Sequence, residues 1–185
     1  MRIVAGRFRG RTLKTPSGAS IRPTTDRLRE TLFNVLAHGY DDAVTGARVL
    51  DLFAGTGALG IEALSRGAAY ALFVDDGVES RSVLRANSEA FGIAAVSRIF
   101  RRDATKLGPA HPIQPFNLLF ADPPYGRGLG ERALASARAG GWLAPDALCV
   151  VEEATDAAFA APEGFEELER RAYGDSELVF LRSEG

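Results

Sequence analysis

The sequence has almost none of the residues that build cross-links or metal centres. Its 185 residues include one cysteine, Cys149, and two histidines, His38 and His111. One cysteine excludes a disulfide framework and a multi-cysteine zinc site, and two histidines are too few for a histidine-based metal centre. We therefore expect a protein of a reducing compartment that binds no metal and folds by burying an apolar core.

The sequence also lacks an apolar run long enough to cross a membrane. Asp51, Arg66 and Asp75 interrupt its most hydrophobic region, whereas a spanning helix needs about 20 apolar residues. Residues 1–10 carry three arginines and no apolar block, unlike a secretory signal. With 46% hydrophobic and 25% charged residues the composition is typical of one globular domain. We expect a cytoplasmic monomer with no membrane contact.

Basic and acidic residues are unevenly distributed along the chain. Residues 1–29 hold eight basic residues and one acidic residue, whereas the remainder holds 14 basic and 23 acidic residues. The net charge of −2 therefore hides a basic arm on an acidic body. Such an arm can bind a polyanion, because each phosphate neutralised by arginine releases counterions. A solvated, poorly ordered terminus is the alternative.

Short apolar runs alternate with stretches of helical spacing and predict an α/β fold. The runs are apolar throughout, as in parallel strands buried on both faces. They comprise residues 48–53, 70–75, 97–100, 117–121 and 147–151. Helices are expected at residues 24–38, with Thr24 as N-cap, and at 58–66, 78–91 and 130–139. Residues 165–172 and 177–182 flank a turn and predict an antiparallel hairpin. Together these form a doubly wound, mostly parallel seven-stranded sheet.

A glycine-rich turn follows the first predicted strand. Gly55, Gly57 and Gly60 fit the spacing G-x-G-x-x-G, and Asp75 lies 20 residues beyond Gly55 at the end of the second strand. The glycines let a ligand approach the backbone, and the carboxylate suits ribose hydroxyls. The loop alone does not separate a nicotinamide dinucleotide from another adenosine-bearing cofactor. A turn that only packs helix on strand is the third interpretation.

Two further aspartates bear on the cofactor. Asp51, just before the loop, suits a ligand with a cationic amino-acid end such as S-adenosylmethionine, whereas it would repel a pyrophosphate. Asp103 follows the third strand and could accept a hydrogen bond from an adenine amine. A solvated loop aspartate is the alternative for Asp103.

A second candidate site, Asp122-Pro123-Pro124-Tyr125, follows the fourth strand. It should emerge beside the glycine loop at the carboxyl edge of the sheet. Two prolines fix the backbone and leave a carbonyl free to face a ligand. A carboxylate and a fixed carbonyl can accept both hydrogens of a nucleobase amine, and tyrosine can stack on an unpaired or flipped base. A rigid strand-end turn with an aromatic cover is the alternative.

Three stretches of the sequence, residues 2–11, 22–34 and 51–68, together resemble the RsmD family. This is a family of bacterial 16S ribosomal RNA guanine-N2 methyltransferases. The similarity runs from residue 2 to about residue 152. It is weak after Glu153, and no role is assigned to the segment that follows. The resemblance implies a Rossmann-like class I fold, S-adenosylmethionine as cofactor, and 16S rRNA as partner, either naked or within the 30S subunit or an assembly intermediate.

The resemblance also assigns roles to residues. The cofactor would be held by Asn34, Asp51, Phe53, Gly55, Thr56, Gly57, Asp75 and Asp103. The target guanine would be held by Asp122, Pro123, Pro124 and Tyr125. RNA would be bound by Arg7, Arg9, Arg11, Arg22, Thr24 and Arg27. Residues 1–39 would then be an RNA-binding extension and residues 40–185 the methyltransferase domain. One departure is the run Asp75-Asp76-Gly77, where relatives often have Glu, a variable residue and Asp.

Three other functions are alternatives to this one. A nicotinamide-dependent dehydrogenase would need a substrate domain for which no chain is left. A catalytically silent RNA-binding protein would not need the intact Asp122 and Tyr125. A DNA adenine-N6 methyltransferase would share both sites, and only the basic arm and residues 22–34 favour ribosomal RNA over DNA.

Overall fold

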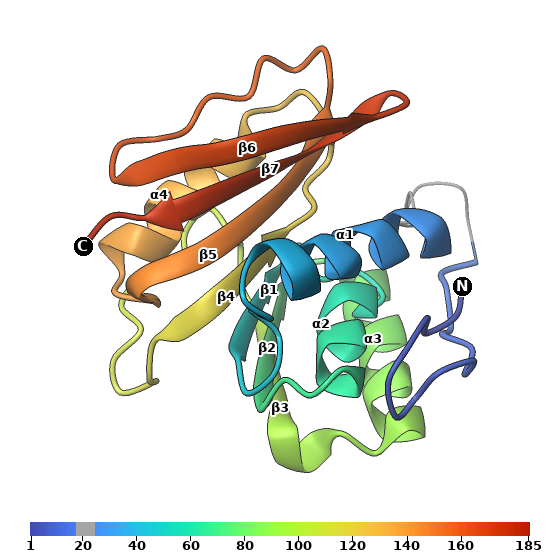
Figure 1. Cartoon of the computed structure of the whole chain (residues 1–185). Helices are drawn as coiled ribbons and strands as arrows, with labels where there is room; N and C mark the ends of the chain where they lie inside the picture. Colours follow the sequence, from blue (N-terminus) through green and yellow to red (C-terminus); the bar gives the residue numbers. More distant parts are fainter. Residues whose placement is uncertain (18–24) are drawn as a thin grey trace.

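Seven strands form one sheet with helices on both faces (Figure 1). The computed structural model describes residues 1–17 and 25–185. The strands are β1 (Arg48–Leu52), β2 (Tyr70–Asp75), β3 (Ser97–Arg101), β4 (Phe116–Ala121), β5 (Leu143–Ala154), β6 (Phe165–Tyr173) and β7 (Ser176–Ser183). They lie in the order β3-β2-β1-β4-β5-β7-β6. Strands β1 to β5 are parallel, and β7 pairs antiparallel with both β5 and β6.

The helices divide between the two faces of the sheet. They are α1 (Asp26–Gly39), α2 (Ala58–Ser65), α3 (Val78–Phe91), the short 3-10 helix η1 (Ala94–Val96) and α4 (Leu129–Ala139). The first three pack on one face with the basic arm, and α4 packs on the other (Figure 1). Among the described residues, no helix combines the length and apolar composition that a membrane crossing needs. The doubly wound α/β fold expected from the sequence is confirmed.

Burial on both faces explains why the strand sequences are apolar throughout. In β4, Leu118 and Phe120 point into the core beneath α1 to α3, whereas Leu119 and Ala121 point into the core beneath α4. All four side chains are at most 1% exposed. Neighbouring residues of a strand face opposite sides of the sheet. When both sides are covered by helices, every residue of the strand is buried, so the sequence is apolar throughout and does not alternate between apolar and polar residues.

Two elements, α1 and β5, have bounds that differ from the predicted ones by more than one residue. The N-cap of α1 is Thr25, whose Oγ1 accepts a hydrogen bond from Leu28 N at 3.1 Å; the expected cap, Thr24, lies outside the described residues. Strand β5 is longer than residues 147–151 at both ends. The apolar pattern is interrupted there by a bulge, because Asp146 has a φ of 60° and the register with β4 shifts.

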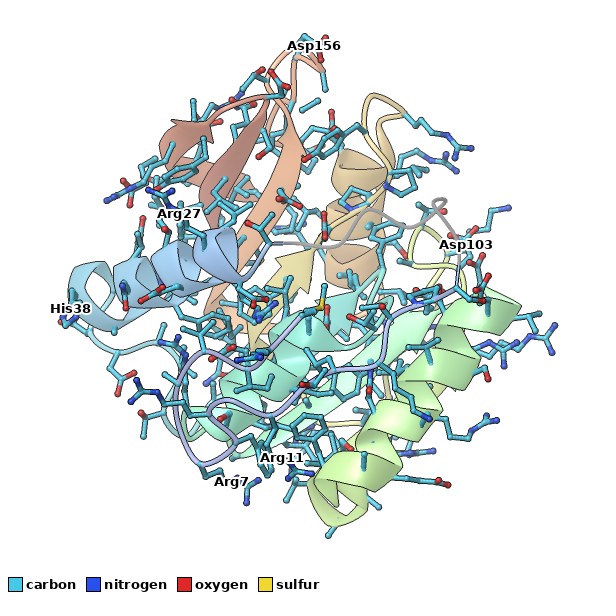
Figure 2. The ribbon with its side chains drawn as sticks, turned by 90° about the vertical axis from the view of Figure 1, so that its right-hand side faces the viewer. Arg7, Arg11, Arg27, His38, Asp103 and Asp156 are labelled. Atoms are coloured by element: carbon cyan, nitrogen blue, oxygen red, sulfur yellow. The ribbon has the colours of Figure 1, made fainter. Side chains whose placement is uncertain are left out.

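Residues 1–17, the described part of the basic arm that precedes α1 and is called the arm below, pack onto the domain. Ile3, Phe8 and Leu13 are buried in the same core as α1, α2 and α3, and an antiparallel bridge between Arg2 and Thr12 closes the arm into a loop. In Figure 2 the arm crosses in front of α2 and α3. The arm and the sheet share one core. The expected division into an RNA-binding extension, residues 1–39, and a methyltransferase domain, residues 40–185, therefore stays a prediction about the roles of these two parts of the chain.

A buried ion pair joins the arm to two helices. Arg29 of α1 and Glu62 of α2 have fully buried side chains, and Arg29 Nε donates to Glu62 Oε1 at 3.1 Å. The same carboxylate accepts hydrogen bonds from Val4 N at 2.9 Å, Ala5 N at 3.1 Å and Arg66 Nε at 2.8 Å. Buried charges cost several kcal/mol unless they are paired and hydrogen-bonded. Here the charge of Glu62 is compensated by groups of the arm, of α1 and of the end of α2, and these hydrogen bonds hold the three segments together.

Removing one member of this pair should destabilise the whole domain. Arg29→Ala leaves Glu62 buried without the fully buried one of its two arginine partners, and breaking a buried ion pair typically costs about 3–5 kcal/mol. We expect the free energy of unfolding, measured by urea denaturation, to fall by about that amount, and protease to cut the arm sooner. Arg27→Ala, on the exposed face of the same helix, is the control and should change stability by less than about 0.5 kcal/mol. Equal effects of the two substitutions would contradict the assigned role of Glu62.

Candidate functional site

The carboxyl ends of four parallel strands meet at one edge of the sheet and line a cavity of about 670 Å³. The strand order reverses between β1 and β4, which is where ligands bind in doubly wound folds. The cavity walls include Phe53 and Gly55 after β1, residues 75–77 after β2, residues 102–105 after β3, and residues 122–125 after β4. The volume lies within the usual range for small-molecule sites of about 300–1,000 Å³.

Asp75 holds the glycine loop against the end of β2. Its Oδ2 accepts a hydrogen bond from Gly55 N at 2.9 Å, and its Oδ1 accepts one from Gly77 N at 2.8 Å. Gly55 has a φ of +59°, and a Cβ built there would meet no atom closer than Phe53 O at 3.9 Å. The backbone at Gly55 is therefore open to a ligand. Each carboxylate oxygen of Asp75 has a second lone pair for a ligand hydroxyl.

Gly57 and Gly60 serve packing instead. A Cβ on Gly57 would lie 2.5 Å from Leu84 Cδ1 of α3, and one on Gly60 would lie 2.4 Å from Phe73 Cε1 of β2. Both distances are far below van der Waals contact, so the absence of a side chain at Gly57 lets α3 approach the loop, and the absence of one at Gly60 lets α2 approach β2. The G-x-G-x-x-G spacing thus combines one ligand-facing glycine with two packing glycines.

Four expected cofactor residues do not line the cavity: Asn34, Asp51, Thr56 and Gly57. Asn34 lies on the exposed face of α1. Thr56 is 6% exposed, and its Oγ1 donates to Met1 Sδ of the arm at 3.7 Å. Asp51 is 2% exposed, and its Oδ2 accepts a hydrogen bond from Gly60 N at 3.0 Å. The structure therefore places these residues behind or beside the ligand-facing surface.

Asp103 lines the cavity as a turn carboxylate. Its Oδ1 accepts hydrogen bonds from Thr105 Oγ1 at 2.7 Å and Thr105 N at 2.8 Å. These bonds hold the pKa of Asp103 below its usual value, because they stabilise the charged form. Asp103 is therefore ionised at neutral pH and can accept a further hydrogen bond from a ligand.

The segment after β4 brings all four expected catalytic residues to the cavity. Asp122, Pro123, Pro124 and Tyr125 line it together. The next residue, Gly126, donates its backbone N–H to Oε1 of Glu153 at 3.0 Å, and Glu153 is 1% exposed at the end of β5. Glu153 thus ties the segment to the neighbouring strand. Sequence reasoning did not assign Glu153, although a buried acid after an apolar run is costly without such hydrogen bonds.

Three arginines at the cavity were also missed: Arg102, Arg127 and Arg132. Each is exposed and follows a strand or opens a helix near the Asp122 segment. They belong to no sequence pattern, and only their position in the fold reveals them. They give the mouth of a carboxylate-rich cavity a positive rim.

Of the expected RNA-binding residues, the four that the structure describes do not form one patch. Arg7 and Arg9 are exposed on the arm, and Arg27 is exposed on α1. Figure 2 shows Arg27 apart from Arg7 and Arg11, and all three away from Asp103. The remaining two residues, Arg22 and Thr24, lie outside the described part of the chain.

Arg11 has a structural role in addition to any RNA contact. Its Nη2 donates to Ala90 O at 2.5 Å near the end of α3. Its guanidinium carbon lies 4.3 Å from the ring centroid of Phe91 and 5.4 Å from that of Phe8. A cation over an aromatic ring and at a helix C-terminus is favourable, so Arg11 fastens the arm to α3.

Asp51 should make stability depend on pH. Burial, with a smaller contribution from Asp75, raises the pKa of Asp51 well above its ordinary value. The folded state therefore holds this proton more tightly than the unfolded state, whose aspartate pKa is about 3.9, and stability falls as pH rises above that value. Asparagine keeps an oxygen for Gly60 N and carries no charge. We expect Asp51→Asn to match the unsubstituted protein near about pH 4 and to exceed its stability increasingly toward about pH 8.

Urea denaturation at stepped pH, without cofactor, measures this difference, and Asp156→Asn at an exposed loop position is the control. Parallel curves for Asp51→Asn and the unsubstituted protein would contradict the raised pKa.

Known proteins resemble this chain along nearly its whole length. The family model described as "Conserved hypothetical protein 95" matches residues 1–182. Ribosomal RNA small subunit methyltransferase D of Escherichia coli (strain K12) is 42% identical over 153 residues, which cover 82% of this chain and 74% of that protein.

Solved structures share the fold. The Escherichia coli protein yhhF has a TM-score of 0.83 and 36% identity, with 100% of this chain and 98% of that chain covered. An RNA methyltransferase from Salinibacter ruber in complex with S-adenosyl-L-homocysteine has a TM-score of 0.66 at 12% identity, with 88% of this chain and 94% of that chain covered, and shows the fold alone.

The family match and the 42% identity agree with the resemblance of residues 2–11, 22–34 and 51–68 to RsmD proteins. The chain is therefore an RNA methyltransferase of the RsmD family, the ribosomal RNA small subunit methyltransferases D.

Proposed function

We propose that the protein transfers the methyl group of S-adenosylmethionine to the exocyclic N2 amine of a guanine in 16S ribosomal RNA. The observation that carries this proposal is that one cavity joins the glycine loop and Asp75 to Asp122 and Tyr125. A donor site and a nucleobase site within a single cavity allow the reacting atoms to meet. The guanine and the 16S rRNA are supported by the family to which the chain belongs.

The lining residues fit an adenosine-bearing cofactor with a cationic end. Gly55 offers open backbone, Asp75 offers fixed carboxylate oxygens to ribose hydroxyls, and Asp103 offers one to an adenine amine. With Asp76, three carboxylates line this part of the cavity. This set would repel the pyrophosphate of a dinucleotide and attract a sulfonium and an ammonium group. When bound, S-adenosylmethionine supplies an electrophilic methyl group.

Asp122 acts on the amine of the target base. A guanine amine is a poor nucleophile because its lone pair is delocalised into the ring. Carboxylate oxygens of Asp122 would accept an amine hydrogen and stabilise the positive charge that grows on nitrogen as the new carbon–nitrogen bond forms and the methyl–sulfur bond of the donor breaks. The donor would leave as its neutral thioether, S-adenosylhomocysteine, and the methylated nitrogen would lose one proton to Asp122 or solvent. Pro123 and Pro124 fix the carbonyl that accepts the other hydrogen, and Tyr125 stacks on the base.

The positive rim of the cavity serves the RNA backbone. A base in a helix cannot reach the cavity, so the target must be unpaired or flipped out. Arg102, Arg127 and Arg132 then lie where phosphates next to the flipped nucleotide would pass. Arg7 and Arg9, farther away on the arm, contact another part of the RNA. This division separates positioning of the target nucleotide from general affinity.

Asp122→Asn tests the catalytic assignment. The substitution preserves size but replaces an acceptor oxygen with a donor amide, so one amine hydrogen loses its partner in the transition state. Loss of such a preorganised contact typically costs about a hundredfold to a thousandfold in turnover. We expect that loss in single-turnover methyl transfer to 30S subunits at saturating cofactor, with cofactor and RNA affinity nearly unchanged.

Glu131→Gln is the matched control, because Glu131 lies at the start of α4 and does not line the cavity. Near-normal turnover of Asp122→Asn would remove Asp122 from the mechanism. A variant that instead failed to bind cofactor would place Asp122 in the cofactor subsite.

Arg7 and Arg9 should set RNA affinity without touching the cofactor. We expect the double variant Arg7→Ala/Arg9→Ala to bind 16S rRNA more weakly and to reduce the slope of log affinity against log salt by about 0.7 to 0.9 per lost phosphate contact. Arg11 is left in place because it fastens the arm to α3. Fluorescence anisotropy over a salt series measures the slope, with cofactor binding as the control. Unchanged affinity and slope would show that these two arginines do not contact RNA.

A further inference from the structure

We propose that Asn87 of α3 is a positioning residue that couples the basic arm to the glycine loop, so that cofactor binding and docking of the arm stabilise each other. The inference rests on the proposed function in that the ligand of the loop is S-adenosylmethionine. It goes further by giving the arm a second role, support of the cofactor loop, besides contact with RNA.

The side chain of Asn87 bonds to both segments at once. It is 1% exposed. Lys14 N of the arm donates to its Oδ1 at 2.8 Å, and its Nδ2 donates to Lys14 O at 3.1 Å and to Thr56 O of the glycine loop at 2.9 Å. A primary amide has two donor hydrogens, and here one serves the arm and one serves the loop.

A second contact between arm and loop lies at the same residue of the loop. Thr56 Oγ1 donates to Met1 Sδ at 3.7 Å and accepts a hydrogen bond from Ala58 N at 3.3 Å. Met1 in turn is bound to the far end of the arm, because Leu13 N donates to Met1 O at 2.9 Å. Both ends of the arm are therefore connected to Thr56. Met1 contacts the Thr56 hydroxyl directly, and Lys14 is linked to the Thr56 carbonyl through the side chain of Asn87.

These contacts support the ligand-facing side of the loop from behind. Gly55, adjacent to Thr56, opens on the cavity and is held in front by Asp75. Release of Lys14 would leave the buried amide of Asn87 short of two hydrogen bonds, which is costly. A ligand that orders the loop therefore favours the docked arm, and by thermodynamic reciprocity the docked arm favours the ligand.

Ser65 of α2 provides a matched control. It is 4% exposed, its Oγ accepts a hydrogen bond from Phe8 N at 3.0 Å, and it donates to Ala5 O at 2.6 Å. Ser65 thus anchors the middle of the arm and makes no hydrogen bond to the loop. Ser65→Ala loosens the arm alone, whereas Asn87→Ala loosens both the arm and the loop.

The first measurement is the affinity of the full-length protein for S-adenosylhomocysteine by calorimetry. We expect Asn87→Ala to weaken it about tenfold, because the loop loses a buried hydrogen bond of ordinary strength, and Ser65→Ala to change it less than about twofold. Should Asn87→Ala fail to fold, Asn87→Ser takes its place, since serine is neutral and keeps a small polar group at this buried position but is too short to bridge Lys14 and Thr56.

The second measurement is hydrogen exchange at the backbone amide of Lys14, which lies outside the cavity. S-adenosylhomocysteine should slow this exchange in the unsubstituted protein and in Ser65→Ala, and should have no such effect in the Asn87 variants. Binding without any change at Lys14, or Asn87 variants with normal affinity, would overturn the coupling alone. No binding of S-adenosylhomocysteine by the unsubstituted protein would overturn the proposed function and this inference with it.

Discussion

The parallel pairing of β1 with both β2 and β4 is the constraint on which the site depends. Leu52, the last residue of β1, is paired with Val74 on one side and Ala121 on the other. The glycine loop must therefore emerge between Asp75 and Asp122. Asp75 accepts a hydrogen bond from Gly55 N of the loop with one carboxylate oxygen and one from Gly77 N after β2 with the other, while the Asp122 segment is held by Glu153. One register thus brings the glycine loop with Asp75, the proposed donor subsite, and the Asp122 segment, the proposed acceptor subsite, into a single cavity.

The arm is packed into the same domain as the sheet that carries the site. Its apolar residues lie in the core of α1 to α3, and the buried carboxylate of Glu62 binds its backbone together with Arg29. A charge that needs all its partners to be tolerated in the interior makes the arm's position specific. The exposed arginines are consequently presented from a fixed support, and the ends of the arm reach the glycine loop. Under the proposed function, RNA contact by the arm and cofactor binding by the loop would therefore be linked through this packing.

The sequence predicted the elements well because strands buried on both faces leave short apolar runs, and here these runs alternate with stretches of helical spacing, as a parallel α/β sheet requires. It failed where a local choice depends on tertiary contacts: the bulge at Asp146 lengthens β5. The same distinction separates the expected site residues that line the cavity from those that do not. Strand-end residues such as Asp75, Asp103 and Asp122 reach the cavity because topology places every strand end there. Asp51 and Thr56 do not, since a motif does not say toward which side a loop residue points. Asn87 and Glu153 had no pattern at all, because their roles arise only from segments distant in the sequence.

The most direct test of the account is identification of the methylated nucleoside. The purified protein is given methyl-labelled S-adenosylmethionine with 30S subunits, naked 16S rRNA or duplex DNA, and each nucleic acid is digested to nucleosides and separated. The account predicts label in N2-methylguanosine from 16S rRNA, in at least one of its two forms. Label in N6-methyladenosine, label confined to DNA, or no transfer to either form of the rRNA would contradict it.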